Sequence, residues 1–138
     1  MKIRDLDGAV YSWKISGHVV RASEERPRSQ LHLKARKLLK GVYPTVQILE
    51  EVPFQLRRNQ RGFLDFYINT IKTVVEVHGS QHYKFNQLYH ASLQHFINQK
   101  KRDVDLVEWC EINNLNYIEL PFNENEDQWK NRILQNSN

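Results

Sequence analysis

The chain has 138 residues, of which 40% are hydrophobic and 26% are charged, and its formal net charge at pH 7 is +4. These values are typical of one globular domain with a real core, and they exclude a disordered or low-complexity chain. The single cysteine, Cys110, excludes an internal disulfide and a cysteine-rich zinc site. No apolar run is long enough to span a bilayer, and the first residues lack a signal-peptide pattern. We therefore expect an intracellular, cytoplasmic protein without membrane contact, and the basic surplus suits a polyanionic partner.

Hydrophobic periodicity predicts a mixed α/β fold. The stretch AVYSWKIS alternates apolar and polar side chains, as a half-buried strand does, and Ser29 is a typical N-cap for a helix that Gly41 ends. Three β-branched strands follow, then a helix, a strand and a helix, which gives an α-β-β-β-α-β core with one long crossover. A break within the second helix near Lys100 is one interpretation of its pattern. The predicted strands are 9–16, 45–52, 63–69, 72–78 and 116–120, and the predicted helices are 29–41, 89–114 and 126–134.

Two of the predicted core strands contain an acidic residue each. We predict that they form a hairpin with a two-residue loop at 70–71, and in that register Asp65 lies directly opposite Glu76. Directly opposed side chains are about 5 Å apart and like charges there repel, so a purely structural hairpin gains nothing from this pair. A divalent cation between the two carboxylates turns this repulsion into a net attraction, because two carboxylates at that separation form half of a Mg²⁺ site. Period two also places His78 on the face of Glu76.

A polar cluster, HGSQH, follows the second acid at once. Gly79 is expected to end the strand in a turn with positive φ. Gln81 and His82 would then fold back over the two acids. Either acid alone reads as a solvent-facing strand residue, but the acids and this cluster together favour a catalytic site.

The combination of Asp65 with the sequence EVHGSQH at 76–82 resembles the core motif of the PD-(D/E)XK nuclease superfamily. It is similar in particular to the branch of the very short patch repair (Vsr) endonucleases and Vsr-like homing endonucleases. The downstream KKRDVDLVEWCEINNLNYIEL resembles the charged helix and final strand of that branch. The resemblance implies a restriction-endonuclease-like fold, with a mixed sheet flanked by helices. It covers about residues 29–135, so we expect a nuclease core domain at 29–138 and an N-terminal β extension at 1–28.

The resemblance implies a metal-dependent DNA endonuclease that hydrolyses phosphodiester bonds in double-stranded DNA. Asp65 and Glu76 would bind Mg²⁺, with Mn²⁺ as a substitute, and in this superfamily the backbone carbonyl of Val77 supplies a further ligand. The ion would polarise the scissile phosphate and activate a water molecule. A small free-standing homing or mobile-element endonuclease fits the compact chain. One active site cuts one strand, so a double-strand break would need a homodimer, a higher homo-oligomer or sequential nicking.

The sequence departs from the superfamily pattern at the third motif position, which is usually Lys and here is His78. A neutral imidazole can accept a proton from water near neutral pH, and an imidazolium can stabilise the developing negative charge. Gln81, His82 or Lys84 can share this work, so the identity of the general base stays open.

A helix Glu upstream often completes the site in this superfamily. The matching helix here has Gln30 and His32 instead, and the next strand has Glu50 and Glu51 as weak substitutes. Glu50 shares a face with apolar neighbours but lies near a strand end, where we expect it to reach solvent.

Basic residues cluster on either side of the acidic motif, and we expect them to contact DNA phosphates in a salt-dependent manner. Tyr83 and Phe85 either cover the site or wedge into a DNA groove, whereas the tryptophans and Cys110 are predicted to lie in the core. The expected DNA-binding residues are Arg57, Arg58, Arg61, Lys84, Lys100, Lys101 and Arg102.

Other functions stay open. A repair nickase would prefer mispaired DNA, and a non-catalytic DNA-binding module would bind DNA without cutting it. A zinc site is conceivable at His78 and His82 with His90 and His95, but a His-Glu-X-X-His motif and a Cys pair are both absent. An HNH nuclease is disfavoured because its ββα unit does not fit these strands.

Overall fold

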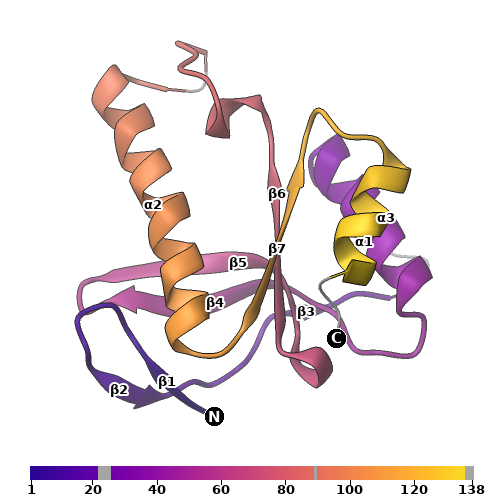
Figure 1. The fold of residues 1–138 in the computed structure, drawn as a ribbon, viewed down its shortest axis with the longest axis horizontal. Coiled ribbons are helices and arrows are strands. Elements are labelled where there is room, and N and C mark those ends of the chain that lie inside the picture. Colours follow the sequence, from indigo (N-terminus) through magenta and orange to yellow (C-terminus); the bar gives the residue numbers. More distant parts are fainter. Residues whose placement is uncertain (22–25, 89, 136–138) are drawn as a thin grey trace.

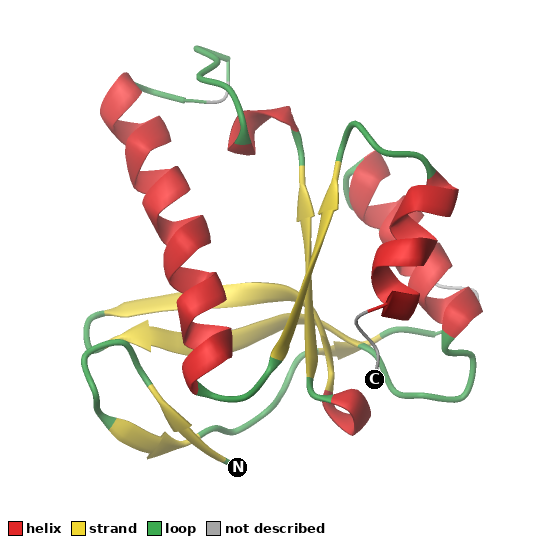
Figure 2. Ribbon diagram, viewed as in Figure 1, coloured by secondary structure: helices red, strands yellow, loops and turns green. Residues whose placement is uncertain are grey.

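A mixed sheet of five strands forms the centre of the fold, with helices on both of its faces (Figures 1 and 2). The computed structural model describes residues 1–21, 26–88 and 90–135. The helix start predicted at Tyr89 lies outside the described residues, as do 22–25 of the expected extension and 136–138 of the expected core. The strands are β1 (Lys2–Arg4), β2 (Val10–Ser12), β3 (His18–Val19), β4 (Leu49–Arg57), β5 (Gln60–Ile68), β6 (Thr73–His78) and β7 (Asn116–Pro121), and the helices are α1 (Gln30–Val42), α2 (Leu93–Ile112) and α3 (Glu126–Gln135).

The predicted mixed α/β class is confirmed. Strands run in the order β3-β4-β5-β6-β7, and each pair is antiparallel except β6 and β7, which are parallel because α2 connects them as a crossover. The pattern predicts β2, α1, β4 to β7, α2 and α3 in this order. It does not predict β1 and β3, which are only three and two residues long. β1 and β2 form a separate two-stranded sheet.

Two hydrophobic clusters hold the helices against opposite faces of the sheet. Trp109 of α2 belongs to one cluster with Tyr67 of β5. Leu39 of α1 and Trp129 of α3 belong to the other, with Phe66. Neighbouring residues of β5 therefore point to opposite faces, as the period of two requires. The core residues predicted from the sequence and found buried are Trp13, Trp109, Cys110 and Trp129.

Helix α2 runs without interruption, so the break predicted near Lys100 is wrong. Ser92 caps the helix, and its hydroxyl accepts a hydrogen bond from the backbone N–H of His95 at 3.1 Å. The apolar pattern changes because the first half of α2 extends beyond the sheet (Figure 1), where Leu93 and Ile97 are exposed. Ser29 caps α1 as predicted. Within the described residues, no helix has both the length and the apolar character that crossing a membrane requires.

Strand β4 is longer than predicted and pairs with β5 in one long hairpin. The predicted strand at 45–52 is displaced, since β4 begins at Leu49 and continues past Pro53 to Arg57. Proline reads as a strand end, but an edge strand tolerates it, and β3 pairs with β4 only at its first two residues. The segment RRNQR therefore forms the tip of the hairpin and the start of β5.

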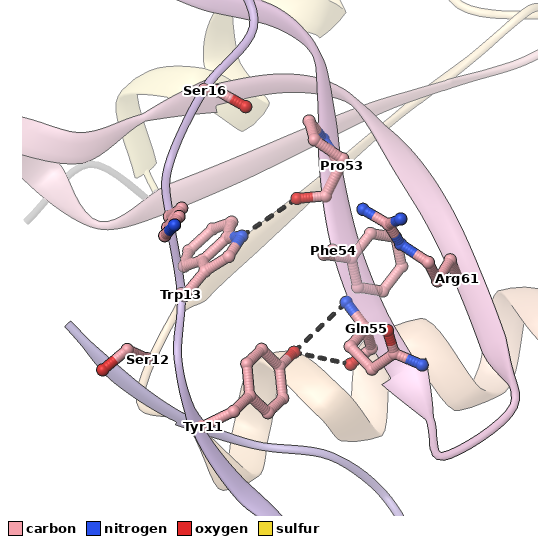
Figure 3. A pocket seen from close by; sticks show the side chains of 9 residues that line it. Tyr11, Ser12, Trp13, Ser16, Pro53, Phe54, Gln55 and Arg61 are labelled. Atoms are coloured by element: carbon pink, nitrogen blue, oxygen red, sulfur yellow. Dashed lines mark hydrogen bonds between the residues drawn. The ribbon is translucent and has the colours of Figure 1, made fainter.

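Side chains from the N-terminal segment cover the open edge of β4 (Figure 3). The indole of Trp13 donates a hydrogen bond to the carbonyl oxygen of Pro53 at 2.9 Å. The hydroxyl of Tyr11 donates to the carbonyl oxygen of Gln55 at 2.8 Å and accepts from the backbone N–H of the same residue at 3.1 Å. These bonds satisfy groups that a further strand would otherwise pair.

We expect Tyr11→Phe to lower the free energy of unfolding by about 1–2 kcal/mol, because both backbone groups of Gln55 lose their partner while the ring packing remains. Urea unfolding measures this difference. Ser12→Ala, at an exposed neighbouring position, is the control. An equal effect of the two substitutions would contradict the role given to the hydroxyl.

Candidate metal and catalytic site

The predicted register of the β5–β6 hairpin is confirmed. Ile68 pairs with Thr73, and the pairing continues to Phe66 and Val75. Extending this register by one residue places Asp65 opposite Glu76. The turn between the strands is a single 3₁₀ turn (Asn69–Ile71) followed by Lys72 in the left-handed conformation, with φ of 50°. The two-residue loop predicted at 70–71 is therefore wrong, since residues 69–72 all belong to the turn, but the register is the one that this loop predicts.

The two carboxylates replace the next backbone hydrogen bonds between the strands. The backbone N–H of Asp65 donates to Oε2 of Glu76 at 2.6 Å. In return, the backbone N–H of Val77 donates to Oδ2 of Asp65 at 2.9 Å. Each acid is therefore held by the opposite strand, and both carboxylates lie in the same gap between β5 and β6.

Register extends this pair into a row of four carboxylates, one on each of four neighbouring strands. On the β4 side, residues 50 and 52 pair with residues 66 and 64, which places Glu51 opposite Asp65. On the β7 side, Glu76 pairs with Glu119. The outer two acids have partners: Glu51 forms an ion pair with Arg28, and Glu119 lies 3.1 Å from a histidine nitrogen.

The inner two acids have no such compensation. Within the described part of the chain, no Lys, Arg or His side chain lies within ion-pair distance of Asp65 or Glu76. Burial, and after it the charge of Asp65, raises the pKa of Glu76 well above its usual range, against the hydrogen bond from the backbone of Asp65 and the positive charge of Arg102. The hairpin therefore holds two like charges in a position where a cation would stabilise both.

Glu50 does not reach solvent, and that expectation is wrong. Its side chain is fully buried beneath α1, with Arg36 Nε at 2.5 Å and His32 Nε2 at 3.3 Å from its carboxylate, and Arg26 also bound to it. Burial alone raises the pKa of Glu50, but the neighbouring His32 and Arg36 outweigh it and lower the pKa to about 2. Glu50 is thus bound to arginines and His32 is buried beside it, whereas Gln30 is exposed at the start of α1.

Because its folded pKa is depressed, Glu50 stabilises the fold above its ordinary pKa of 4.5 and loses that effect as the pH falls toward 2. We expect Glu50→Gln to cost about 3 kcal/mol at pH 7, since it leaves a buried guanidinium without a counter-charge. The cost should shrink as the pH of the urea titrations falls from 5 toward 2. A cost that does not change with pH would contradict this account.

His78 lies at the end of β6, where its ring is fixed from three sides. Its Nδ1 is 3.1 Å from Oε1 of Glu119, its Nε2 is 3.5 Å from the hydroxyl of Tyr117, and its ring stacks on that of His82 at 4.1 Å. Glu119 also accepts a hydrogen bond from the hydroxyl of Tyr83 at 2.7 Å. The hydrogen bond with His78 contributes most to lowering the pKa of Glu119 to about 2, although burial opposes it.

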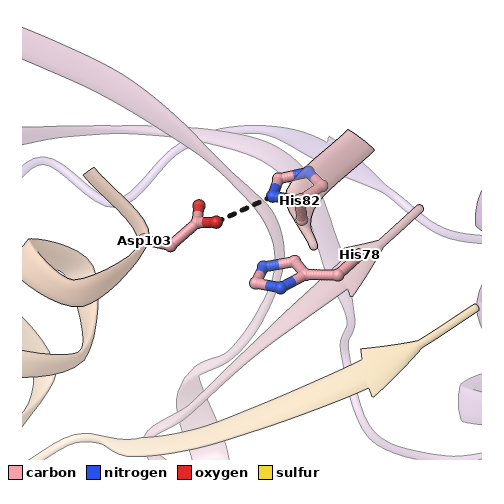
Figure 4. Close-up of side chains that lie close together, drawn as sticks. All are labelled: His78, His82 and Asp103. Atoms are coloured by element: carbon pink, nitrogen blue, oxygen red, sulfur yellow. Dashed lines mark hydrogen bonds and ion pairs between the residues drawn. The ribbon is translucent and has the colours of Figure 1, made fainter. Parts of the chain in front are cut away.

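His82 lies in a short 3₁₀ helix (Ser80–His82) beyond β6 and is oriented by an acid from α2. Its Nδ1 is 2.9 Å from Oδ2 of Asp103 (Figure 4), and both side chains remain partly exposed. Gly79, which connects the strand to this helix, has φ of −75°, so the positive φ predicted there is wrong. A side chain at this position would instead collide with that of Gln81.

Sequence reasoning missed Asp103 and Glu119. The segment at 99–106 predicts a charged helix with two acids, Asp103 and Asp105. Only the packing of α2 beside β6 shows that Asp103 is the one that faces the histidines. Pairing of β6 with β7 likewise brings Glu119 into the site. A pocket of about 160 Å³ lies here, lined by both histidines and both of these acids, together with Tyr83, Lys100, Val104, Val107 and Tyr117.

The expected DNA-binding residues lie in three segments, namely the β4–β5 hairpin, the stretch after β6, and α2. Lys100 lies over the ring of Tyr83 at 5.5 Å, and the guanidinium of Arg102 lies over Gly62 of β5, so α2 presents basic groups beside the carboxylates. Arg57 is paired with Asp105 and Asp7 instead. Arg58 and Arg61 lie at the tip of the β4–β5 hairpin, and Lys84 and Lys101 are exposed.

Comparison with known proteins gives one partial relative and no family. The chain is 39% identical over 59 residues to the uncharacterized protein 307L of Invertebrate iridescent virus 6. The match covers 43% of this chain and 30% of the viral protein, so the chain corresponds to less than a third of that protein's length. No family model matches the chain, and no solved structure matches it.

Proposed function

We propose that the protein is a metal-dependent DNA endonuclease of the PD-(D/E)XK type, which hydrolyses phosphodiester bonds at the gap between β5 and β6. The observation on which the proposal rests is the pair Asp65 and Glu76. Each carboxylate is held by the opposite strand, and neither has a basic partner among the described residues. The two outer acids of the same row do have partners, so the lack of compensation is specific to this pair.

The arrangement of elements supports the proposal. In the described residues, α1, β4, β5, β6, α2 and β7 follow each other in the α-β-β-β-α-β order that the resemblance implies. The sheet is mixed, and helices cover both faces. The Asp lies in the middle strand of the meander and the Glu near the end of the next, as in the motif.

Asp65 and Glu76 fit a hard divalent ion, because two carboxylate oxygens in one gap are the ligands that Mg²⁺ prefers. The carbonyl of Val77 follows directly in β6 and would be the third protein ligand, and Mn²⁺ would substitute for Mg²⁺. When bound, the ion supplies Lewis-acid polarisation of the phosphate and a more acidic water. Glu51 and Glu119 already have Arg28 and His78 as partners, whereas the inner two acids have none. A cation would therefore bind at Asp65 and Glu76.

We assign to His82 the acceptance of the proton from the attacking water. Its Nδ1 faces Asp103, which fixes the ring and leaves Nε2 for proton transfer. His78 stands at the motif position usually occupied by Lys, but Glu119 and Tyr117 engage both of its nitrogens. We therefore assign His78 to positioning of the His82 ring, against which it stacks, and not to proton transfer.

DNA binding should depend on the basic residues of α2 more than on those already paired within the protein. We expect Lys101→Ala to reduce the slope of log affinity against log salt by about one unit, because one phosphate contact is lost. Arg57→Ala should reduce it less, since this guanidinium is bound to Asp105 and Asp7. Fluorescence anisotropy at several salt concentrations measures both slopes. Equal reductions would contradict this assignment.

The test of the function is cleavage of supercoiled and mixed-sequence DNA with Mg²⁺ or Mn²⁺, beside an EDTA control and the Glu76→Ala variant. We expect nicked or linear products that need the metal and disappear in the variant. Binding of DNA without cleavage by either ion would favour the second candidate, a DNA-binding module that has lost catalysis. That candidate has one observation in its favour, the absence of a Lys at the position of His78.

The biological role belongs to the same proposal. A homing or mobile-element endonuclease should cut a defined site in fully paired DNA, whereas a Vsr-like repair nickase should cut a mispaired substrate faster than its paired counterpart. Matched duplexes that differ by one mismatch distinguish these two roles. Sedimentation of the protein on DNA would show whether a homodimer is needed for a double-strand break.

A further inference from the structure

We propose that His78, His82 and Asp103 form a second metal site, which binds a transition-metal ion of the Zn²⁺ class and in doing so stops catalysis. The binding is independent of the proposed nuclease function, whereas the effect on catalysis rests on it. The three residues come from β6, from the 3₁₀ helix after it and from α2, and they converge from three sides (Figure 4).

Distances between the donor atoms support this site. One donor atom from each of His78, His82 and Asp103 lies within 4.8 Å of the other two. A tetrahedral ion with bonds of about 2.0–2.1 Å needs donors about 3.3 Å apart, so they must approach by no more than about 1.5 Å. The two rings stack in parallel, with an angle of 3° between their planes, so both rings must tilt out of the stack for their nitrogens to reach a shared ion.

The ligand set selects the kind of ion. Two imidazoles and one carboxylate suit Zn²⁺ and its neighbours, whereas the oxygen pair of Asp65 and Glu76 suits Mg²⁺. The histidine site would thus prefer Zn²⁺, which is the softer ion, and the carboxylate pair would prefer Mg²⁺, which is the harder one. Three protein ligands also leave a fourth position open for water, as in zinc sites that are not purely structural.

The surroundings of the site favour a cation. Glu119 faces Nδ1 of His78, and an acid behind a histidine is the usual outer partner that orients a metal-binding imidazole. The ion would bind Nε2 of His78 in place of its long contact of 3.5 Å with the hydroxyl of Tyr117. The charges of Glu76 and Asp103 act on one another across the site. Lys100 lines the same pocket but is exposed, so its ammonium can turn to solvent. His82 and Asp103 are partly exposed, so an ion can enter from outside.

Binding at this site would remove the proposed general base. An ion held between Nδ1 of His82 and Asp103 would replace the proton on Nδ1. The neutral ring would then carry its proton on Nε2, and Nε2 would have no electron pair with which to accept the proton of the attacking water. Zn²⁺ should therefore inhibit Mg²⁺-dependent cleavage without displacing Mg²⁺ from the carboxylates, and the inhibition should follow occupancy of the histidine site.

The experiment is a calorimetric titration of the full chain with Zn²⁺, followed by the visible absorption of Co²⁺ as a probe of a tetrahedral site. We expect one ion per chain in the wild type, in the matched control His95→Ala, and in a double variant Asp65→Asn/Glu76→Gln. Affinity should fall by at least about 10–100-fold in His82→Ala and in Asp103→Ala. Thermal unfolding without metal checks that each variant is folded, and Asp103→Ala, on the surface of α2, is the safer of the two.

The outcomes separate this proposal from the nuclease function. Absence of Zn²⁺ binding, unchanged affinity in Asp103→Ala, or loss of binding in the double variant would each overturn the second site. If Zn²⁺ binds as expected but the protein cuts no DNA, the site stands and the function fails. If the protein cuts DNA and Zn²⁺ inhibits it at the concentrations that fill the site, both proposals are supported. Cleavage that persists with the site filled would overturn the inhibitory role.

Discussion

Glu76→Gln is expected to lower Mg²⁺-dependent cleavage by at least about 10³-fold, and to make the metal-free protein more stable. The rate falls because the ion loses a charged ligand, and a bound ion contributes several kcal/mol to such a reaction. The stability rises because the amide removes a partly buried charge of the same sign as that of Asp65, while its oxygen can still accept the backbone hydrogen bond that Glu76 accepts at 2.6 Å. Relief of about 1–2 kcal/mol corresponds to a rise in melting temperature of roughly 3–8 °C.

Melting curves with and without Mg²⁺ measure the second effect. The wild type should be stabilised by the ion and the variant should not, since stabilisation by a ligand requires its binding to the native state. Glu108→Gln, which changes an exposed glutamate of α2 in the same way, is the control and should behave as the wild type. A variant that is less stable than the wild type without metal would show that the Asp65–Glu76 pair does not strain the fold.

His82→Ala is expected to lower the cleavage rate by about 10²–10⁴-fold at unchanged DNA affinity, because the variant lacks the proposed general base. Asp103→Asn should lower the rate by about 10–100-fold, since the ring keeps its proton-accepting nitrogen but loses the group that orients it. Single-turnover kinetics with saturating enzyme separates the rate from binding.

Added imidazole distinguishes a chemical role of His82 from a structural one. It should restore part of the rate of His82→Ala and none of the rate of Asp103→Asn, where the ring is still present. His95→Ala, on the exposed side of α2, is the matched control. If His78→Ala responds to imidazole and His82→Ala does not, the assignment of the base must be reversed.

The register of the β5–β6 hairpin could be predicted from the sequence because it depends on local features. Two short β-branched strands joined by so few residues can pair in few registers. Counting back from the turn places Asp65 opposite Glu76 both for the two-residue loop that the sequence predicts and for the turn at 69–72 that the structure has. The N-cap of α1 at Ser29 and the core positions of the tryptophans were equally local. Each depends on residues close together in the chain.

The rest depends on packing between distant segments. Asp103 and Glu119 join the site only because α2 and β7 lie beside β6, and nothing in their own stretches distinguishes them from solvated acids. Glu50 was misplaced because its partners, Arg36 above all, lie on a different element. A break was expected near Lys100 because the apolar pattern changes there. The helix is continuous, and the pattern changes because only its second half packs on the sheet.

Diffraction from crystals soaked in Mn²⁺, collected at the manganese absorption edge, tests the central claim most directly. The account predicts an anomalous peak between the carboxylates of Asp65 and Glu76, within bonding distance of the carbonyl oxygen of Val77. A gap between β5 and β6 that stays empty at saturating Mn²⁺, with both carboxylates ordered, would contradict it.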